Sequence, residues 1–216
     1  IMNWSQPKVY AVKHKDEEIR AASRSGGIFT ALSDLVLDDG GTVYGCVLTD
    51  DFHAVHVRTD SRDGRNQMRG SKYIQSKMGD TYKKVQEDLN AKREVLFSGT
   101  SCQVAGLKHF LGKDYDNLIC IDIVCHGVPS PVVWDKYLRW QEHKNHGKVV
   151  KVDFRNKKDF GWKDHVETIW FDNGKNVSSP IFKNLFYGHM VLRPSCYECP
   201  YKSIMHPGDI LKNRAT

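Results

Sequence analysis

The sequence predicts an α/β fold: a mixed sheet with a parallel βαβ core and additional antiparallel strands. Residues 94–112 (EVLFSGTSCQVAGLKHFLG) begin as an apolar strand, turn at Ser, Gly and Thr, and continue as a helix, and 117–124 form a second apolar run. A strand, helix and strand of this length normally pair two parallel strands through a right-handed crossover. Alternating segments within 42–58 and 149–178 favour antiparallel pairing.

The first part of the chain is expected to contain a strand, a helix and a hairpin. Residues 8–12 (KVYAV) are predicted as a strand. Ser25 is the expected N-cap of a helix whose apolar residues follow the helical period as far as Gly40. Residues 42–48 and 53–58 alternate in polarity and predict a hairpin.

The later part is expected to add a helix and an antiparallel sheet. Residues 131–146 have the pattern of an amphipathic helix, and 149–154, 166–171 and 175–178 resemble strands.

Composition and charge limit the class of protein. The chain has 216 residues, of which 40% are apolar, and contains no repeat or linker, so we expect one domain over 8–210 and a tail at 211–216. The net charge is +6, but basic residues are interleaved with acidic ones, which argues against nucleic acid. No apolar stretch approaches the ~20 residues of a membrane span, and no leader pattern opens the chain. A cytoplasmic protein is predicted.

The cysteines suggest a metal site. Cys46 and Cys120 lie in apolar strands and are expected in the core. The other four lie in predicted loops or turns: Cys102, Cys125, Cys196 and Cys199. A Cys-x-x-Cys pair and two further loop cysteines complete the ligand set of an iron–sulfur cubane or of structural zinc. From spacing alone, zinc, a cluster, a redox disulfide and reduced surface thiols all remain open.

Several motifs, in order, resemble the beta-subunit family of coenzyme F420 hydrogenases and dehydrogenases. They are SRSGGIFTAL (23–32), GSKYIQSKMGDTYKKVQEDL (70–89), VLFSGTSCQVAGLKHFL (95–111), CHGVPSP (125–131) and RPSCYECPYKSIMHPGDI (193–210). The resemblance covers most of 8–210. It implies FAD and a 4Fe–4S cluster, with Cys102, Cys125, Cys196 and Cys199 as the cluster ligands.

The chain departs from this family in three ways. It has no Cys-x-x-Cys-x-x-Cys pattern, so we expect the ferredoxin-like N-terminal domain of many members to be absent from this chain. Ser101 stands where the family often has proline, and the tail LKNRAT replaces an acidic and aromatic continuation.

The resemblance also implies flavin contacts. Two glycines before a helix could hold a phosphate on free N–H groups, although a tight turn explains them as well. The implied contacts are Ser25, Gly26, Gly27, Thr30, Ser71, Lys72, Tyr73, Gln75, Ser76, Ser98, Gly99 and Thr100. Lys72 is the candidate catalytic residue, because a fixed cation near the ring would stabilise charge on the reduced flavin.

Other polar residues have two interpretations each. His126 adjoins Cys125 and could tune a cluster by hydrogen bonding or be structural. Arg155, Lys163 and His165 could receive an acidic substrate or be solvated strand-end groups.

The implied function is an oxidoreductase. A deazaflavin such as coenzyme F420, or another small hydride donor or acceptor, would exchange a hydride with FAD. The cluster would pass single electrons to or from a ferredoxin-like partner domain or subunit. The alternative is a zinc-stabilised binding or assembly module, held by the same four cysteines and without redox activity.

Overall fold

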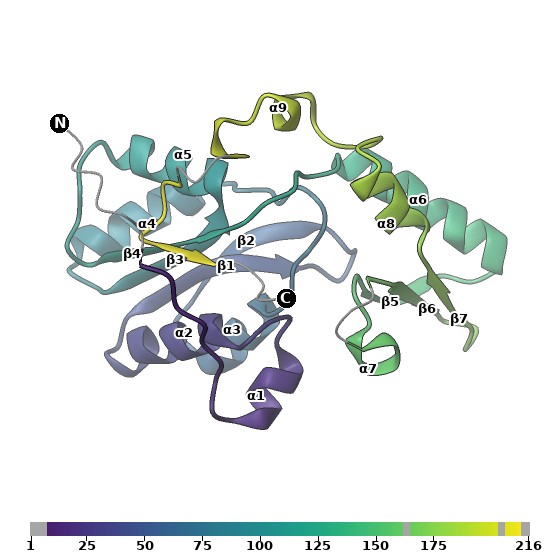
Figure 1. Ribbon diagram of the computed structural model, residues 1–216, viewed down its shortest axis with the longest axis horizontal. Coiled ribbons are helices and arrows are strands. Elements are labelled where there is room, and N and C mark those ends of the chain that lie inside the picture. The colour runs from purple at the N-terminus through teal and green to yellow at the C-terminus, as the bar shows by residue number, and fades with distance from the viewer. Residues whose placement is uncertain (1–7, 162–164, 203–205, 213–216) are drawn as a thin grey trace.

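The main sheet is mixed, and its central strands are parallel (Figure 1). The computed structural model describes residues 8–161, 165–202 and 206–212. Within them the strand order is β2-β1-β3-β4-β8, with β2 antiparallel to β1 and the other neighbours parallel. The strands are β1 (Thr42–Leu48), β2 (Ala54–Thr59), β3 (Val95–Thr100), β4 (Leu118–Ile123) and β8 (Ile210–Lys212). The predicted fold class is confirmed.

Helices cover both faces of this sheet because successive strand residues point to opposite sides. In β3, Phe97 packs with the apolar faces of α4 and α5, whereas Leu96 packs with α2 and α3. The helices are α2 (Ile28–Asp38), α3 (Arg62–Met68), α4 (Thr81–Asn90) and α5 (Ser101–Leu111).

A second unit, built from the later part of the chain, lies beside the main sheet (Figure 1). Its core is aromatic, and Trp134, Phe154 and Phe182 pack with Ile169. Strands β5, β6 and β7 form the predicted antiparallel sheet. The elements are α6 (Pro131–Asn145), β5 (Val149–Asp153), α7 (Lys157–Phe160), β6 (Glu167–Phe171), β7 (Asn176–Ser179) and α8 (Ile181–Tyr187).

The N-terminal prediction needs two corrections. Residues 8–12 form no strand, and the N-cap of α2 is Gly27 rather than Ser25. Both differences arise because the 12–14 segment crosses the glycines, and the His14 N–H donates to the Gly26 carbonyl over 2.6 Å. A Cβ on Gly26 would lie 2.6 Å from the Val12 carbonyl oxygen, so a side chain there would displace this segment.

Several short elements were not predicted. Helix α1 (Glu17–Ala22) buries no residue, and α3 and α9 (Pro194–Tyr197) are too short to show a helical period. A 3₁₀ turn, η1, spans Pro200–Lys202. Strand β8 includes Leu211 and Lys212, which were assigned to the tail, and 213–216 lie outside the described residues. No helix in the described ranges is long and apolar enough to cross a bilayer.

Candidate functional site

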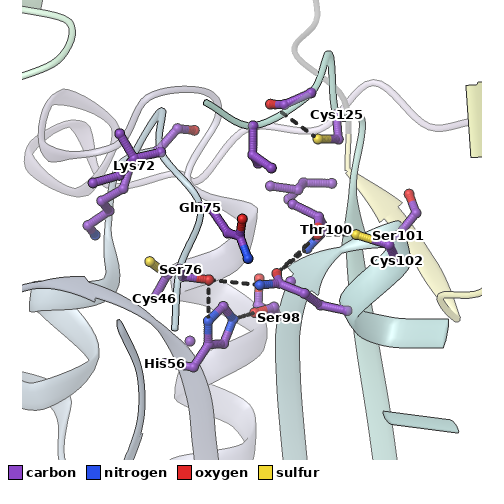
Figure 2. A pocket seen from close by; sticks show the side chains of 18 of the residues that line it. Cys46, His56, Lys72, Gln75, Ser76, Ser98, Thr100, Ser101, Cys102 and Cys125 are labelled. Atoms are coloured by element: carbon purple, nitrogen blue, oxygen red, sulfur yellow. Dashed lines mark hydrogen bonds between the residues drawn. The ribbon is translucent and has the colours of Figure 1, made fainter. Parts of the chain in front are cut away.

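One cavity of about 650 Å³ lies beyond the carboxyl ends of β3 and β4. This is where ligands bind in open α/β sheets, and the volume is typical of cofactor sites. Most of the predicted flavin-contacting residues line it: Thr30, Ser71, Lys72, Gln75, Ser76, Ser98, Gly99 and Thr100. Figure 2 shows residues of these segments converging from several elements.

Four of the predicted flavin contacts lie outside the cavity lining. Ser25, Gly26 and Gly27 form the turn beneath the 12–14 segment, and a Cβ on Gly27 would lie 2.9 Å from the Cβ of His14. Tyr73 points into the second unit, where its ring lies 4.3 Å from His165 and 5.4 Å from Phe186, measured between centroids. Flavin contact at these four positions stays a prediction.

The four loop cysteines line the same cavity. Cys102 lies in the first turn of α5, Cys125 follows β4, and Cys196 and Cys199 flank the end of α9. The pKa of the Cys125 thiol is raised to about 11, mainly by burial and in smaller part by negative charge at Cys102, Cys196 and Cys199. The Cys125 sulfur is therefore within electrostatic reach of each of the other three.

The four thiols do not have the spacing of a formed metal site. Among the described residues, no three His, Cys, Asp or Glu side chains are grouped closely enough to hold a metal ion. Cys102 Sγ lies 3.2 Å from Thr100 Oγ1, and Cys125 Sγ donates to the Gly127 carbonyl over 3.7 Å. The chain thus brings the four thiols to one cavity, where two of them bond to neighbouring oxygens.

The other two cysteines have different environments. Cys120 is fully buried between β3 and the segment before β8, and burial raises its pKa to about 12, which confirms the core assignment. Cys46 packs partly against the core, but it also lines the cavity (Figure 2). Burial raises the pKa of its thiol, partly offset by the nearby Lys72 ammonium.

The cavity is strongly cationic. Its described lining contains no Asp or Glu, but it contains Arg24, Arg69, Lys72, Arg193 and Lys202. Of these, within the described part of the chain, Arg24 is the one in an ion pair with a carboxylate, that of Asp153 on β5. A cavity with several cations and no carboxylate in its described lining favours a ligand bearing phosphates or carboxylates.

Two of these cations are anchored near the helices that flank the sheet. Arg69 Nε donates to Thr30 Oγ1 over 3.1 Å, and burial together with the charge of Arg65 lowers the pKa of Arg69. Lys72 Nζ donates to the carbonyls of Gln67 and Arg69 at 3.0 and 3.2 Å. Burial, helped by the charge of Arg24, lowers the pKa of Lys72 to about 8.

A directed hydrogen-bond network joins the segments predicted to contact a flavin, 70–76 and 98–100, to α5. The Ser98 carbonyl can only accept, so His56 Nε2 donates to it over 3.1 Å, and His56 Nδ1 accepts from Ser76 Oγ over 2.9 Å (Figure 2). Gln103 Nε2 donates to Ser76 Oγ over 2.7 Å, and Gln103 Oε1 accepts the Thr100 N–H over 3.0 Å. Burial lowers the pKa of His56 to about 4, which keeps the imidazole neutral.

The substitution Gln103→Leu should loosen this wall of the cavity. It removes the bonds to Ser76 and Thr100 and leaves the buried Ser76 hydroxyl without its donor, at a cost of about 1–3 kcal/mol in unfolding free energy. Urea denaturation measures the loss. Gln75→Leu is the matched control, because Gln75 lines the same cavity and should change stability by less than about 1 kcal/mol. Equal losses in both variants would contradict the network.

Sequence reasoning missed several lining residues. Gln103 could have been found from the Thr-x-x-Gln spacing at the start of α5, which is the pattern of a capping box. His56 is an inward position of an alternating strand, but its partners come from distant segments. The remaining lining cations had no local signal: Arg24, Arg69 and Arg193 lie in irregular segments, and Lys202 ends the short 3₁₀ turn η1.

Of the polar residues with two interpretations, His126 and His165 contact aromatic rings of the second unit. His126 lines the cavity and packs on the rings of Phe186, Tyr187 and His189, and burial lowers its pKa. His165 and Arg155 are both buried, which excludes the solvated interpretation. Lys163 lies outside the described residues.

Comparisons with known proteins agree with this arrangement. The sequence model that describes the C terminus of the beta subunits of coenzyme F420 hydrogenase/dehydrogenase matches residues 92–211, more than half of the chain. A comparison with curated proteins finds no match. A solved structure titled "Xenon derivatization of the F420-reducing [NiFe] hydrogenase complex from Methanosarcina barkeri" contains a similar chain, with a TM-score of 0.58 and 17% identity.

The structural alignment covers 87% of this chain and 63% of the matched one, so this chain spans somewhat under two thirds of that relative. At this identity the likeness shows the fold. The family match covers α5, β4, the second unit, Cys102, Cys125, Cys196 and Cys199. This chain therefore belongs to the coenzyme F420 hydrogenase/dehydrogenase beta-subunit family, a family of oxidoreductase subunits.

Proposed function

We propose that this chain is a flavin- and iron–sulfur-dependent oxidoreductase module. In this proposal FAD occupies the cavity, and Cys102, Cys125, Cys196 and Cys199 hold a 4Fe–4S cluster at one end of it. A deazaflavin such as coenzyme F420, or a similar small molecule, exchanges a hydride with the flavin. A ferredoxin-like domain or subunit exchanges single electrons with the cluster.

The observation that supports this most strongly is the shared cavity. Residues from three separate polar segments and all four loop cysteines line one space of about 650 Å³. Electron transfer between a flavin and a cluster requires adjacent centres, and a binding module would not require the two residue sets to meet. Membership of an oxidoreductase family supports the same function.

The lining suits a flavin dinucleotide. A diphosphate carries negative charge, and the described lining has five cations and no carboxylate to repel it. Arg69, oriented by Thr30 of α2, and Arg24, oriented by Asp153 of β5, present guanidinium groups at the cavity lining. The backbone and amide groups of Gln75, Ser98 and Gly99 offer hydrogen bonds to an isoalloxazine ring.

The donor set suits a cubane cluster. Four thiols lie together in one part of the described lining, with His126 beside Cys125, and four thiolates are the usual ligation of 4Fe–4S centres. A bound flavin supplies the ability to accept a hydride and release electrons one at a time. The protein's own part is to orient Lys72, to exclude carboxylates and to hold the thiols beside the flavin end of the cavity.

Anaerobic purification followed by absorption spectroscopy and cofactor extraction tests this proposal. We expect the absorption spectrum to contain structured flavin bands and the broad shoulder of an iron–sulfur cluster. Analysis should find iron and sulfide bound to the protein, and both should be lost on exposure to air. Stopped-flow mixing with reduced coenzyme F420, compared with a reduced nicotinamide, then identifies the hydride donor. A colourless protein containing zinc would overturn the proposal in favour of the zinc-stabilised module, for which a four-thiol set is equally suitable.

A further inference from the structure

The segment 206–212 (HPGDILK) is fastened to the sheet directly behind the loop cysteines. Asp209 exchanges two hydrogen bonds with Cys120 of β4: its N–H donates over 3.0 Å and its Oδ2 accepts over 2.7 Å. Asp209 Oδ1 also pairs with Lys108 of α5 at 3.0 Å. Strand β8 then continues parallel to β4, and Figure 1 shows the two strands side by side.

A buried trio of polar side chains completes this attachment. Ser101 Oγ donates to Asp122 Oδ1 over 2.7 Å, and His206 Nδ1 donates to Asp122 Oδ2 over 3.0 Å. The Asp122 side chain has no exposed surface, so a carboxylate here depends on both of these donors. His206 Nδ1 also lies 3.1 Å from Ser101 Oγ, which brings the three residues into mutual contact.

The backbone between His206 and Asp209 is pressed against the backbone and Cβ of Asp122. A Cβ added to Gly208 would lie 2.4 Å from Asp122 Cβ and 3.0 Å from its backbone nitrogen. The close approach therefore requires glycine and leaves little freedom for the segment to slide along β4.

Each member of the trio belongs to a stretch of chain that carries a different cysteine or cysteine pair. Ser101 immediately precedes Cys102, Asp122 lies three residues before Cys125, and His206 follows the Cys-x-x-Cys pair that ends at Cys199. Asp122 and His206 do not line the cavity, so neither would touch a flavin or a substrate. The contacts of Asp122 and His206 instead fix the three cysteine-bearing segments relative to one another.

We propose that Asp122 and His206 are positioning residues that hold the Cys-x-x-Cys segment (194–202) in register with Cys102 and Cys125. The Asp122–His206 contact joins the C-terminal segment to the β4 end, and Ser101 transmits the same constraint to the start of α5. This inference rests on the proposed function insofar as the thiols bind a cluster, but the geometric constraint holds for any metal that the four thiols share.

The test compares His206→Ala, His206→Asn and the control His109→Ala with the parent chain, all purified without oxygen. His109 is an exposed histidine of α5 outside the trio. We expect His206→Ala to lose iron to a chelator about tenfold faster, a penalty typical of outer-shell partners of metal ligands. His206→Asn retains an N–H donor for Asp122 and should recover most of the retention, and His109→Ala should match the parent.

A second measurement does not depend on any bound metal. In the metal-free protein, backbone hydrogen exchange of 194–202 should be faster in His206→Ala than in the parent, while exchange of β1 and β3 stays unchanged. If His206→Ala unfolds, Lys108→Met is the milder substitute, because it removes only the contact with Asp209. The same peptide should then show a smaller acceleration.

The outcomes separate the two hypotheses. A parent chain that binds neither flavin nor iron, yet shows the exchange difference, would reject the proposed function and retain the positioning role. The positioning role would be overturned if hydrogen exchange of 194–202 were unchanged in both His206→Ala and Lys108→Met. It would also be overturned if His206→Ala retained metal as well as the parent, even in a protein that binds both cofactors.

Discussion

The double substitution Cys196→Ser/Cys199→Ser should abolish iron binding and leave the flavin in place. Both residues line the cluster end of the cavity, and serine is a far weaker ligand for iron than a thiolate. Changes to outer-shell partners already cost about 10- to 100-fold in metal affinity, so losing two direct ligands should reduce bound iron by more than about tenfold. Iron and sulfide analysis, with flavin quantified from the same sample, measures the effect.

Cys46→Ser is the matched control. Cys46 lines the same cavity but lies on β1, among the flavin segments, and its thiol is the one lining thiol within the described residues that the proposed ligand set omits. We expect this variant to keep its iron. If Cys46→Ser lost as much iron as the double variant, the ligand assignment would be wrong.

The substitution Lys72→Met should make the flavin harder to reduce while weakening FAD binding only slightly. A single ammonium contributes little among many contacts, but it acts directly on negative charge that arises in the reduced ring. We expect the midpoint potential to fall by on the order of 30 mV, which corresponds to about 1.4 kcal/mol for a two-electron couple. The dissociation constant of FAD should change by less than about tenfold.

The effect should also depend on pH with a defined sign. Burial lowers the pKa of Lys72 to about 8, so the ammonium is charged below that pH and neutral above it. The difference in potential between parent and Lys72→Met should therefore be present at pH 7 and decline as the pH rises through about 8. A nearby anion would raise this pKa and move the decline to higher pH.

Lys72→Arg provides the control, because a guanidinium stays charged throughout this range. Its potential relative to Lys72→Met should show no decline near pH 8. Lys72 also donates to the carbonyls of Gln67 and Arg69, so thermal unfolding of each variant checks that the loop is intact. An unchanged potential together with severely weakened FAD binding would show that Lys72 is a phosphate or structural contact.

Local pattern was sufficient for the framework of the fold. The apolar runs of β3 and β4 and the helical period of α5 are contained within short stretches, and each is enforced by burial of one residue face. Local pattern was also sufficient to distinguish Cys120, which lies inside an apolar strand, from the four loop cysteines. The prediction of an N-terminal strand was wrong because residues 8–12 resemble a strand in composition but lie exposed and do not pair with the sheet, and the chain then continues through 12–14 against the Gly26-Gly27 turn.

Contacts between distant segments were beyond any local pattern. Cys46 was assigned to the core as a strand cysteine, and it does pack partly against the core, but it also lines the cavity. The hydrogen bonds of His56 with Ser76 and Ser98 join segments whose proximity depends on sheet order.

From residue types and spacing alone came the α/β class, the four loop thiols and, through resemblance, the flavin segments, because these depend on local periodicity and recurring motifs. The folded chain added the cationic lining of the cavity, the neutral state of His56 and the trio of Ser101, Asp122 and His206. Burial, hydrogen bonding and close approach depend on residues that are far apart in the sequence. They are therefore determined only when the chain has folded and packed.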